Sequence, residues 1–164
     1  IREAQLQCLD SIPNSGIAIT MDIGDDHCIH PPKKKEVADR LLFNALNQTY
    51  GFGTVDCASP IYDSLEIKDG GIILNFRNAE GGLYSYGELE GFEIAGEDRV
   101  FYPADAKITY KQKQVFVISD SVPDPVAVRY AWRNWIVGTL YDTNLLPASS
   151  FRTDKWDDAT QFEK

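Results

Sequence analysis

The sequence predicts the C-terminal segment of an α/β domain in residues 1–52, followed by an all-β, antiparallel, sandwich-like domain in residues 53–164. Two patterns predict this division. In the first part, a compact apolar run, a polar loop and an amphipathic helix follow one another, which is the order of a parallel strand and its crossover helix. In the second part, apolar residues alternate along short stretches that turn residues separate, which is typical of antiparallel sheets.

The first part contains one expected strand and two expected helices. Residues 1–9 predict the end of a helix, and residues 17–21 predict a strand that is covered on both faces. Pro31 and Pro32 suit the first turn of a second helix, where a missing N–H group costs little, and Gly51 predicts its end. One strand and two helices cannot cover a parallel sheet. We therefore expect this part to be the end of a larger α/β domain, with a segment that simply packs on the β region as the alternative.

The second part is expected to form a series of short strands. Asp69-Gly70-Gly71 has the composition of a hairpin turn between two such strands. Alternating apolar residues predict the strands themselves, in residues 65–67, 72–76, 115–117 and 126–132.

Charge and composition exclude several classes of function. The chain has 164 residues and a formal net charge of −9, which makes it a poor ligand for nucleic acid or for an anionic membrane surface. Its apolar runs are far too short to span a bilayer. The three cysteines have no metal-like spacing, so we expect no metal and no cofactor, while a single disulfide stays open.

Both histidines of the chain lie in one loop, Gly24-Asp25-Asp26-His27-Cys28-Ile29-His30-Pro31-Pro32, which we call the histidine loop. The loop follows the expected strand, and α/β sheets bind their ligands at the carboxyl ends of strands. A histidine at such a place can act as the general base of an acyl transfer. His30 is also open to a purely structural role, and a metal pair of His27 with His30 lacks a third ligand.

A series of short motifs, in order along almost the whole chain, resembles the last segment of the sialate O-acetylesterases. The motifs are Arg2-Glu3-Ala4-Gln5, Asp22-Ile23-Gly24-Asp25, Ile29-His30-Pro31, Ser59-Pro60-Ile61-Tyr62, Gly91-Phe92-Glu93-Ile94-Ala95-Gly96-Glu97-Asp98, Pro125-Val126-Ala127-Val128-Arg129-Tyr130-Ala131-Trp132 and Leu146-Pro147-Ala148-Ser149-Ser150-Phe151-Arg152.

The resemblance implies a secreted, lysosomal or periplasmic serine esterase with a hydrolase domain of the SGNH type, which removes O-acetyl groups from sialic acids or from other acetylated sugars. It implies that His30 takes the proton of the serine hydroxyl and returns it to the leaving sugar oxygen. The serine is expected on an N-terminal portion or chain, which is the expected partner. This chain alone is expected to be inactive.

The acidic partner of His30 departs from the family pattern. The family reads Asp-Ile-His-Pro where this chain has Cys28-Ile29-His30-Pro31. Asp26, four residues before His30, is the expected substitute, and Asp25 or a Ser-His dyad helped by a backbone carbonyl are the alternatives. Two other functions stay open. The β-rich region could be a carbohydrate-binding or structural module without catalysis, and an acetylxylan-type polysaccharide deacetylase would use the same triad chemistry.

Overall fold

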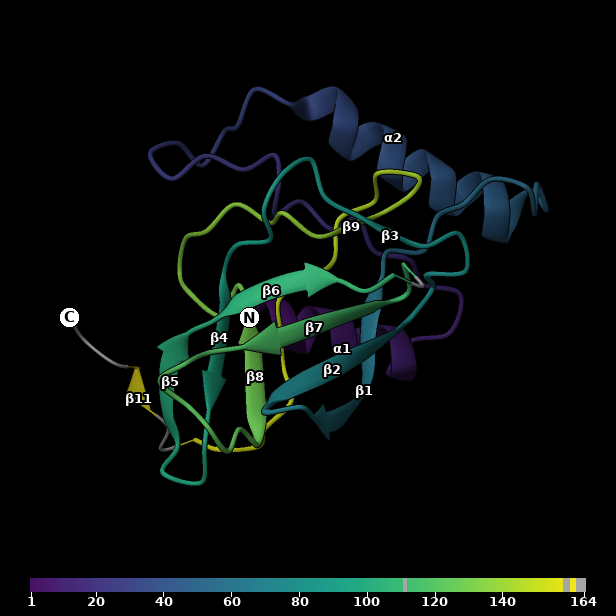
Figure 1. Ribbon diagram of the computed structural model, residues 1–164. Coiled ribbons are helices and arrows are strands. Elements are labelled where there is room, and N and C mark those ends of the chain that lie inside the picture. The colour runs from purple at the N-terminus through teal and green to yellow at the C-terminus, as the bar shows by residue number, and fades with distance from the viewer. Residues whose placement is uncertain (111, 158–159, 162–164) are drawn as a thin grey trace.

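The computed structural model describes residues 1–110, 112–157 and 160–161, and these residues form mostly antiparallel sheets with few helices (Figure 1). The predicted domain 53–164 therefore includes six residues outside the described part, at positions 111, 158–159 and 162–164.

The two expected helices are present, with adjusted ends. Helix α1 spans Arg2–Ser11, and α2 spans Lys34–Asn44 and continues as the short π-helix η1, Ala45–Thr49. Gly51 follows with a positive φ of 75°, a conformation that glycine adopts without strain, as the prediction of a helix stop requires. No residue of α1 is buried, so its packing depends on polar contacts and on partly buried side chains.

The expected strand in residues 17–21 is wrong, because this segment forms no strand in the structure. Ile19 is buried, while Ile17 and Ala18 are only partly buried. A segment becomes a parallel strand only when it forms hydrogen bonds with a neighbouring strand, and a crossover connection must link the two strands. The described residues place no strand beside this segment. The segment therefore has the apolar side chains of a buried strand but lacks the backbone hydrogen bonds that would make it one.

The β region contains two main sheets (Figure 1). One has the strand order β1-β2-β7-β6 and the other the order β10-β8-β4-β5-β11, and a third pair joins β3 to β9. All these pairings are antiparallel except that of β11 with β5. The strands are β1 Ile61–Lys68, β2 Gly71–Arg77, β3 Leu83–Tyr84, β4 Phe92–Ala95, β5 Val100–Pro103, β6 Asp105–Ile108, β7 Gln114–Ile118, β8 Ala127–Tyr130, β9 Tyr141–Asp142, β10 Phe151–Arg152 and β11 Thr160–Gln161.

The predicted hairpin is confirmed as β1 and β2. Asp69 and Gly70 both have positive φ values, 52° and 72°, which is the conformation that a two-residue hairpin turn with the native strand twist requires.

The alternation of apolar and polar residues along the strands sets which side chains point into the core. Ile72, Leu74, Val115 and Val117 are fully buried on β2 and β7, and they share one core cluster with Phe92, Ile94, Val128 and Tyr130 of the other sheet.

Tyr130 is fully buried in this core, and its hydroxyl accepts hydrogen bonds from the backbone N–H groups of Thr139 at 2.9 Å and Leu140 at 3.0 Å. Replacing Tyr130 with phenylalanine leaves both donors unsatisfied, so we expect a loss of about 1–3 kcal/mol in the free energy of unfolding. Urea denaturation followed by circular dichroism measures it. The control is Tyr110→Phe, because Tyr110 is fully exposed and its change should leave stability unaltered. Equal stability of both variants would contradict the role of this hydroxyl.

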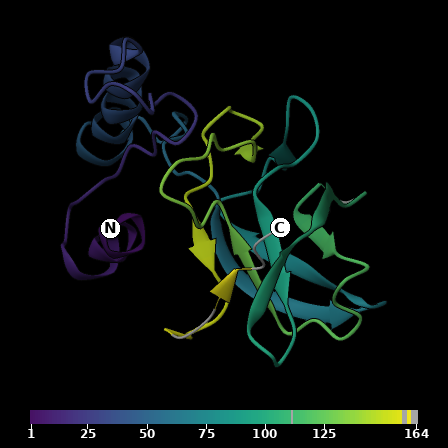
Figure 2. The same ribbon diagram turned by 90° about the vertical axis from the view of Figure 1, so that its left-hand side faces the viewer.

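The first part of the chain is attached to one side of the β region, and Figure 2 shows both helices on that side of the sheets. Arg2 donates from Nε to Oγ of Ser150 at 3.0 Å and from Nη2 to the carbonyl oxygen of Ala131 at 3.0 Å. Glu3 accepts two hydrogen bonds from Arg152, at 2.9 and 3.2 Å. These polar contacts place α1 beside β10.

Candidate functional site

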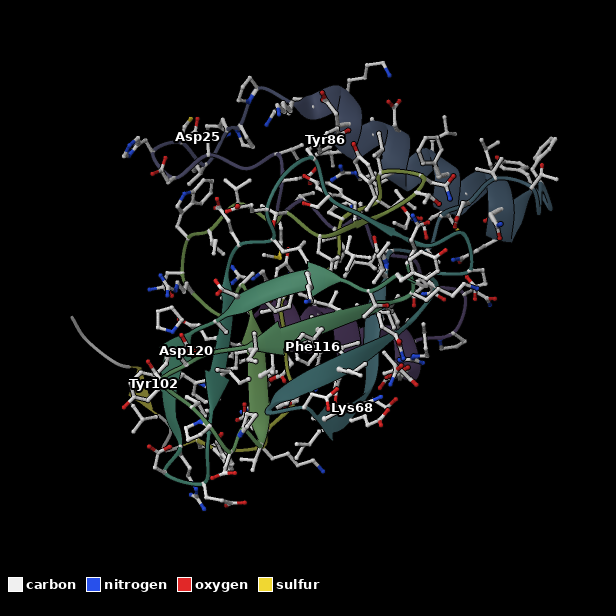
Figure 3. The ribbon with its side chains drawn as sticks, viewed as in Figure 1. Asp25, Lys68, Tyr86, Tyr102, Phe116 and Asp120 are labelled. Atoms are coloured by element: carbon white, nitrogen blue, oxygen red, sulfur yellow. The ribbon has the colours of Figure 1, made fainter. Side chains whose placement is uncertain are left out.

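Asp25 shapes the histidine loop. Its Oδ1 accepts hydrogen bonds from the backbone N–H groups of His27 at 2.8 Å and Cys28 at 3.1 Å. This is an Asx turn, in which a short polar side chain substitutes for a backbone acceptor. The labelled Asp25 lies at the outer edge of the molecule, away from the sheets (Figure 3). The bend of the loop is therefore produced locally, by its own side chain.

His30, the predicted catalytic histidine, is exposed in this loop. Its backbone N–H donates to Sγ of Cys28 at 3.4 Å, and the Cys28 thiol donates to the carbonyl oxygen of His30 at 3.6 Å. Among the residues that the structure describes, the imidazole itself takes part in no hydrogen bond or ion pair. The ring is open to a group from outside the described chain.

Asp26, the predicted acid, lies beside the other histidine. Its Oδ1 is 3.6 Å from Nε2 of His27, and the two side chains are 45% and 90% exposed. The structure thus brings Asp26 together with His27 and not with His30. An exposed pair of this kind is weak, so it does not hold either side chain in place. Orientation of His30 by Asp26 stays a prediction.

A buried ion pair joins Asp22, two residues before the histidine loop, to the middle of α2. Arg40 donates from Nη1 to Oδ1 of Asp22 at 2.8 Å and from Nη2 to Oδ2 at 2.7 Å. Its Nη1 also donates to the carbonyl oxygen of Ile19 at 2.6 Å. Both charged side chains are only 10% exposed. A guanidinium and a carboxylate that meet through two parallel hydrogen bonds have one relative orientation, so the pair holds α2 to the segment that leads into the histidine loop.

Replacing Arg40 with methionine should be strongly destabilising, because it leaves the buried Asp22 carboxylate without its partner. We expect a loss of about 3–5 kcal/mol in the free energy of unfolding. The control is Lys35→Met on the same helix. Lys35 pairs with Asp39 and is 83% exposed, so its loss should change stability little. Urea denaturation of both variants measures the difference. Similar stability losses would show that the buried pair is not special.

The connection between β8 and β9 holds the start of the loop from a second side. A Cβ atom at Gly24 would lie 3.2 Å from Cζ3 of Trp135, so the indole packs on the backbone of the loop. Gly138 donates its N–H to the carbonyl oxygen of Met21 at 3.0 Å. The Met21 sulfur accepts from the N–H of Ser150 at 3.1 Å. Trp135 is 43% exposed, so an aromatic surface from the β region borders the histidine loop.

Tyr141 lies close to the buried ion pair. The pKa of Tyr141 is raised to about 12, chiefly by burial and also by the Asp22 carboxylate, while Arg40 acts to lower it. The hydroxyl is therefore neutral near pH 7 and donates to the carbonyl oxygen of Gly138 at 3.1 Å. Because the fold favours the neutral phenol, this contribution to stability is complete below about pH 10 and is lost as the pH rises toward the folded pKa.

The loop offers acid-base groups rather than a complete catalytic centre. It presents an imidazole, carboxylates and the thiol of Cys28, and the structure shows all three cysteines of the chain as free. Within the described ranges, no group of three or more histidine, cysteine, aspartate or glutamate side chains could hold a metal ion. No described helix is long and apolar enough to cross a membrane.

Sequence reasoning missed two contributions to this site, the Asp22–Arg40 pair and Trp135. A signal existed for Arg40, because it shares one helix face with Val37 and Asn44, and a charge on an inward face needs a partner. The contact of Trp135 with Gly24 has no such signal, since the two residues lie far apart along the chain.

The comparisons with known proteins agree with the motifs. No protein-family model matches the sequence. The sialate O-acetylesterases of Mus musculus and Rattus norvegicus are each 26% identical to this chain over 152 residues, and that of Pongo abelii is 28% identical over 131 residues. These alignments cover 85% of this chain for the two rodent proteins and 76% for the third. The chain spans only 28% of the length of the rodent relatives and 25% of the third.

A solved structure shares the fold. The crystal structure of a carbohydrate acetylesterase from Xanthomonas citri matches with a TM-score of 0.85 and 38% identity, over 94% of this chain and 35% of that chain. The chain is thus similar to part of the carbohydrate acetylesterases, a class of ester hydrolases. Within that class, the relatives support a sialate O-acetylesterase-like family, as the sequence motifs predict.

Proposed function

We propose that this chain is the C-terminal part of a sialate O-acetylesterase and supplies its catalytic histidine, His30. The observation that carries the proposal is the exposed imidazole of His30, whose ring has no partner among the described residues, in a loop whose flanking segments are joined by a buried ion pair. The relatives named sialate O-acetylesterase support the same reading. The nucleophilic serine belongs to an N-terminal portion or chain.

In the proposed reaction, His30 accepts the proton of the serine hydroxyl while the serine oxygen attacks the acetyl carbonyl carbon. The ester C–O bond then breaks, and the imidazolium gives its proton to the leaving sugar oxygen. A water molecule attacks the acetyl-enzyme with the same help from His30 and releases acetate. Asp26 is the proposed acid that orients the ring. The chemistry calls for no cofactor and no metal.

Exposed apolar side chains support an N-terminal partner. In residues 1–52 the exposed fraction is 89% for Ile29, 53% for Leu41 and 50% for Leu42, and it is above half for Ile12 and Phe52. A hollow of about 440 Å³ also runs between α1 and residues 15–21, the segment that lacks its strand partner. Covering these surfaces with the rest of an α/β domain of the SGNH type removes apolar area from water.

Reconstitution tests the proposal. The chain and the N-terminal portion are expressed separately and together, and acetate release from O-acetylated sialic acid is measured. We expect activity only when both are present, and a stable complex on size-exclusion chromatography. A chain that stays a well-behaved monomer and adds nothing to the activity of the N-terminal portion would favour the alternative, a carbohydrate-binding or structural module.

The sugar specificity is a separate part of the proposal. The relatives in mammals are named for sialate, whereas the Xanthomonas citri protein is described only as a carbohydrate acetylesterase. Acetylated xylan is tested in the same assay as the alternative substrate. If it is hydrolysed faster than O-acetylated sialic acid, acetylated xylan becomes the proposed substrate. A secreted, lysosomal or periplasmic location goes with either substrate. Nucleic acid and membranes are not proposed as partners, since the chain carries a net charge of −9.

A further inference from the structure

A groove in the β region lies outside the site described above. Its volume is about 830 Å³, within the range of ligand-binding pockets, and none of its lining residues belongs to residues 1–52. One wall is the segment 83–89, which runs from β3 toward β4, and the other is β6 with Thr109, Tyr110 and Gln112. The N–H of Leu83 donates to the carbonyl oxygen of Gln112, which closes one end of the groove.

The β6 wall offers backbone hydrogen-bonding groups. β6 is an edge strand that pairs only with β7 among the described strands. Thr109 donates its N–H to the carbonyl oxygen of Gln114 at 2.9 Å, and this register directs the N–H and C=O groups of Ala106 and Ile108 away from β7. Thr109 also has a buried hydroxyl without a hydrogen-bond partner among the described residues. A ligand with several hydroxyl groups would pair with the outward-facing backbone groups of this wall, whereas the Thr109 hydroxyl is buried beneath it.

The opposite wall offers an aromatic face. Tyr84 lines the groove and is 38% exposed, and its ring meets that of Tyr86 edge to face at 5.1 Å. Tyr86 in turn meets the ring of Tyr141 at 5.6 Å, next to the Asp22–Arg40 pair. Figure 3 shows Tyr86 above β6, on the side of the molecule that carries α2. A row of three tyrosines thus leads from the groove toward the base of the histidine loop.

The charges of the groove favour an uncharged ligand. Among the described lining residues, Glu88 and Asp105 are acidic, Lys107 is basic and none is an arginine. The Lys107 ammonium lies 5.5 Å from the centre of the Phe116 ring, labelled in Figure 3. Among these described residues, a carboxylate-bearing sugar would meet two like charges, one ammonium and no guanidinium to bind it. An added peptide strand is disfavoured too, because β6 has only four residues and two of them are charged.

We propose that this groove binds a neutral oligosaccharide, which stacks a sugar ring on Tyr84 and gives hydroxyl hydrogen bonds to Asp105, Glu88 and the free edge of β6. The exposed face of an aromatic ring packs against the C–H face of a pyranose, while carboxylates and backbone groups form hydrogen bonds with the sugar hydroxyls. The groove would hold the sugar chain some distance from the bond that is cleaved. Binding there does not depend on His30, so it stands or falls separately from the proposed esterase activity.

Titration of the whole chain with xylohexaose and cellohexaose, followed by calorimetry and by amide NMR shifts, tests the proposal. We expect binding in the millimolar range or tighter, with shifts at Ala106 and Ile108. Tyr84→Ala should weaken binding by about threefold to tenfold, the contribution of one aromatic contact. Tyr84→Phe, which keeps the ring, should bind like the wild type. Tyr50→Ala is the control, since Tyr50 is 69% exposed and lies outside the groove.

Three results would overturn the proposal. They are an absence of binding to both neutral sugars, unchanged affinity in Tyr84→Ala, and binding of N-acetylneuraminic acid as tight as that of the neutral chains. If Tyr84→Ala fails to fold, the affinity of Asp105→Asn is measured in its place. Asp105 is exposed, and this change should also weaken binding. His30→Ala must bind as the wild type does. Loss of binding in that variant would place the ligand in the histidine loop and not in the groove.

Discussion

Replacing His30 with alanine, in the complex with the N-terminal portion, is expected to lower kcat for acetate release by about 10⁴- to 10⁶-fold. Without the imidazole, nothing accepts the serine proton or protonates the sugar oxygen. KM should change little, because the ring is needed in the transition state more than in substrate binding. Acetate release from O-acetylated sialic acid measures both constants.

The matched control for this prediction is His27→Ala. His27 lies in the same loop and is 90% exposed, and its one described side-chain partner is the exposed Asp26. We expect the rate to stay close to that of the wild type. Full activity in His30→Ala would contradict the assignment. Equal losses in both variants would mean that the loop needs its histidines for shape rather than for proton transfer.

Replacing Asp26 with asparagine is expected to lower kcat by about 10⁴-fold, if Asp26 orients His30 as proposed. Asparagine keeps the size of the side chain but favours the wrong tautomer of the histidine. In the structure the Asp26 carboxylate lies beside His27. The prediction therefore requires the loop to turn Asp26 and His30 toward each other when the N-terminal portion is bound.

Asp25→Asn separates this effect from a change in loop shape. The Oδ1 of Asp25 accepts the N–H groups of His27 and Cys28, and an asparagine Oδ1 accepts them equally well. We expect this variant to keep its activity. If Asp26→Asn is as active as the wild type and Asp25→Asn is not, Asp25 is the acid. If both are active, a Ser-His dyad without an acid replaces the triad.

The parts of the fold that could be predicted are those that neighbouring residues decide. The hairpin of β1 and β2 follows from the alternation of apolar residues around Asp69-Gly70, whose positive φ values suit that turn. Helix α2 follows from apolar spacing and from prolines just before it. Both features depend on contacts within a few residues, and a single sequence contains that information.

The strand expected in residues 17–21 shows where such reasoning fails. Its apolar composition is that of a buried strand, and Ile19 is indeed buried. A strand, however, is defined by its neighbour, and the described residues offer none there. The site has the same limit. The family motif predicts His30, whereas the acid that lies beside it depends on the conformation of a short exposed loop, which a single sequence does not specify.

The sequence by itself determined that both histidines share one loop between an apolar segment and a helix, that an antiparallel β region follows, and that the motifs resemble those of sialate O-acetylesterases. Only the tertiary structure decided how the loop is held. Asp22 meets Arg40 in a buried pair, Trp135 packs on Gly24, and the segment 83–89 faces β6 across a groove. The physical reason is that these contacts join residues far apart in the chain, and burial and shape complementarity select them only once the sheets have packed.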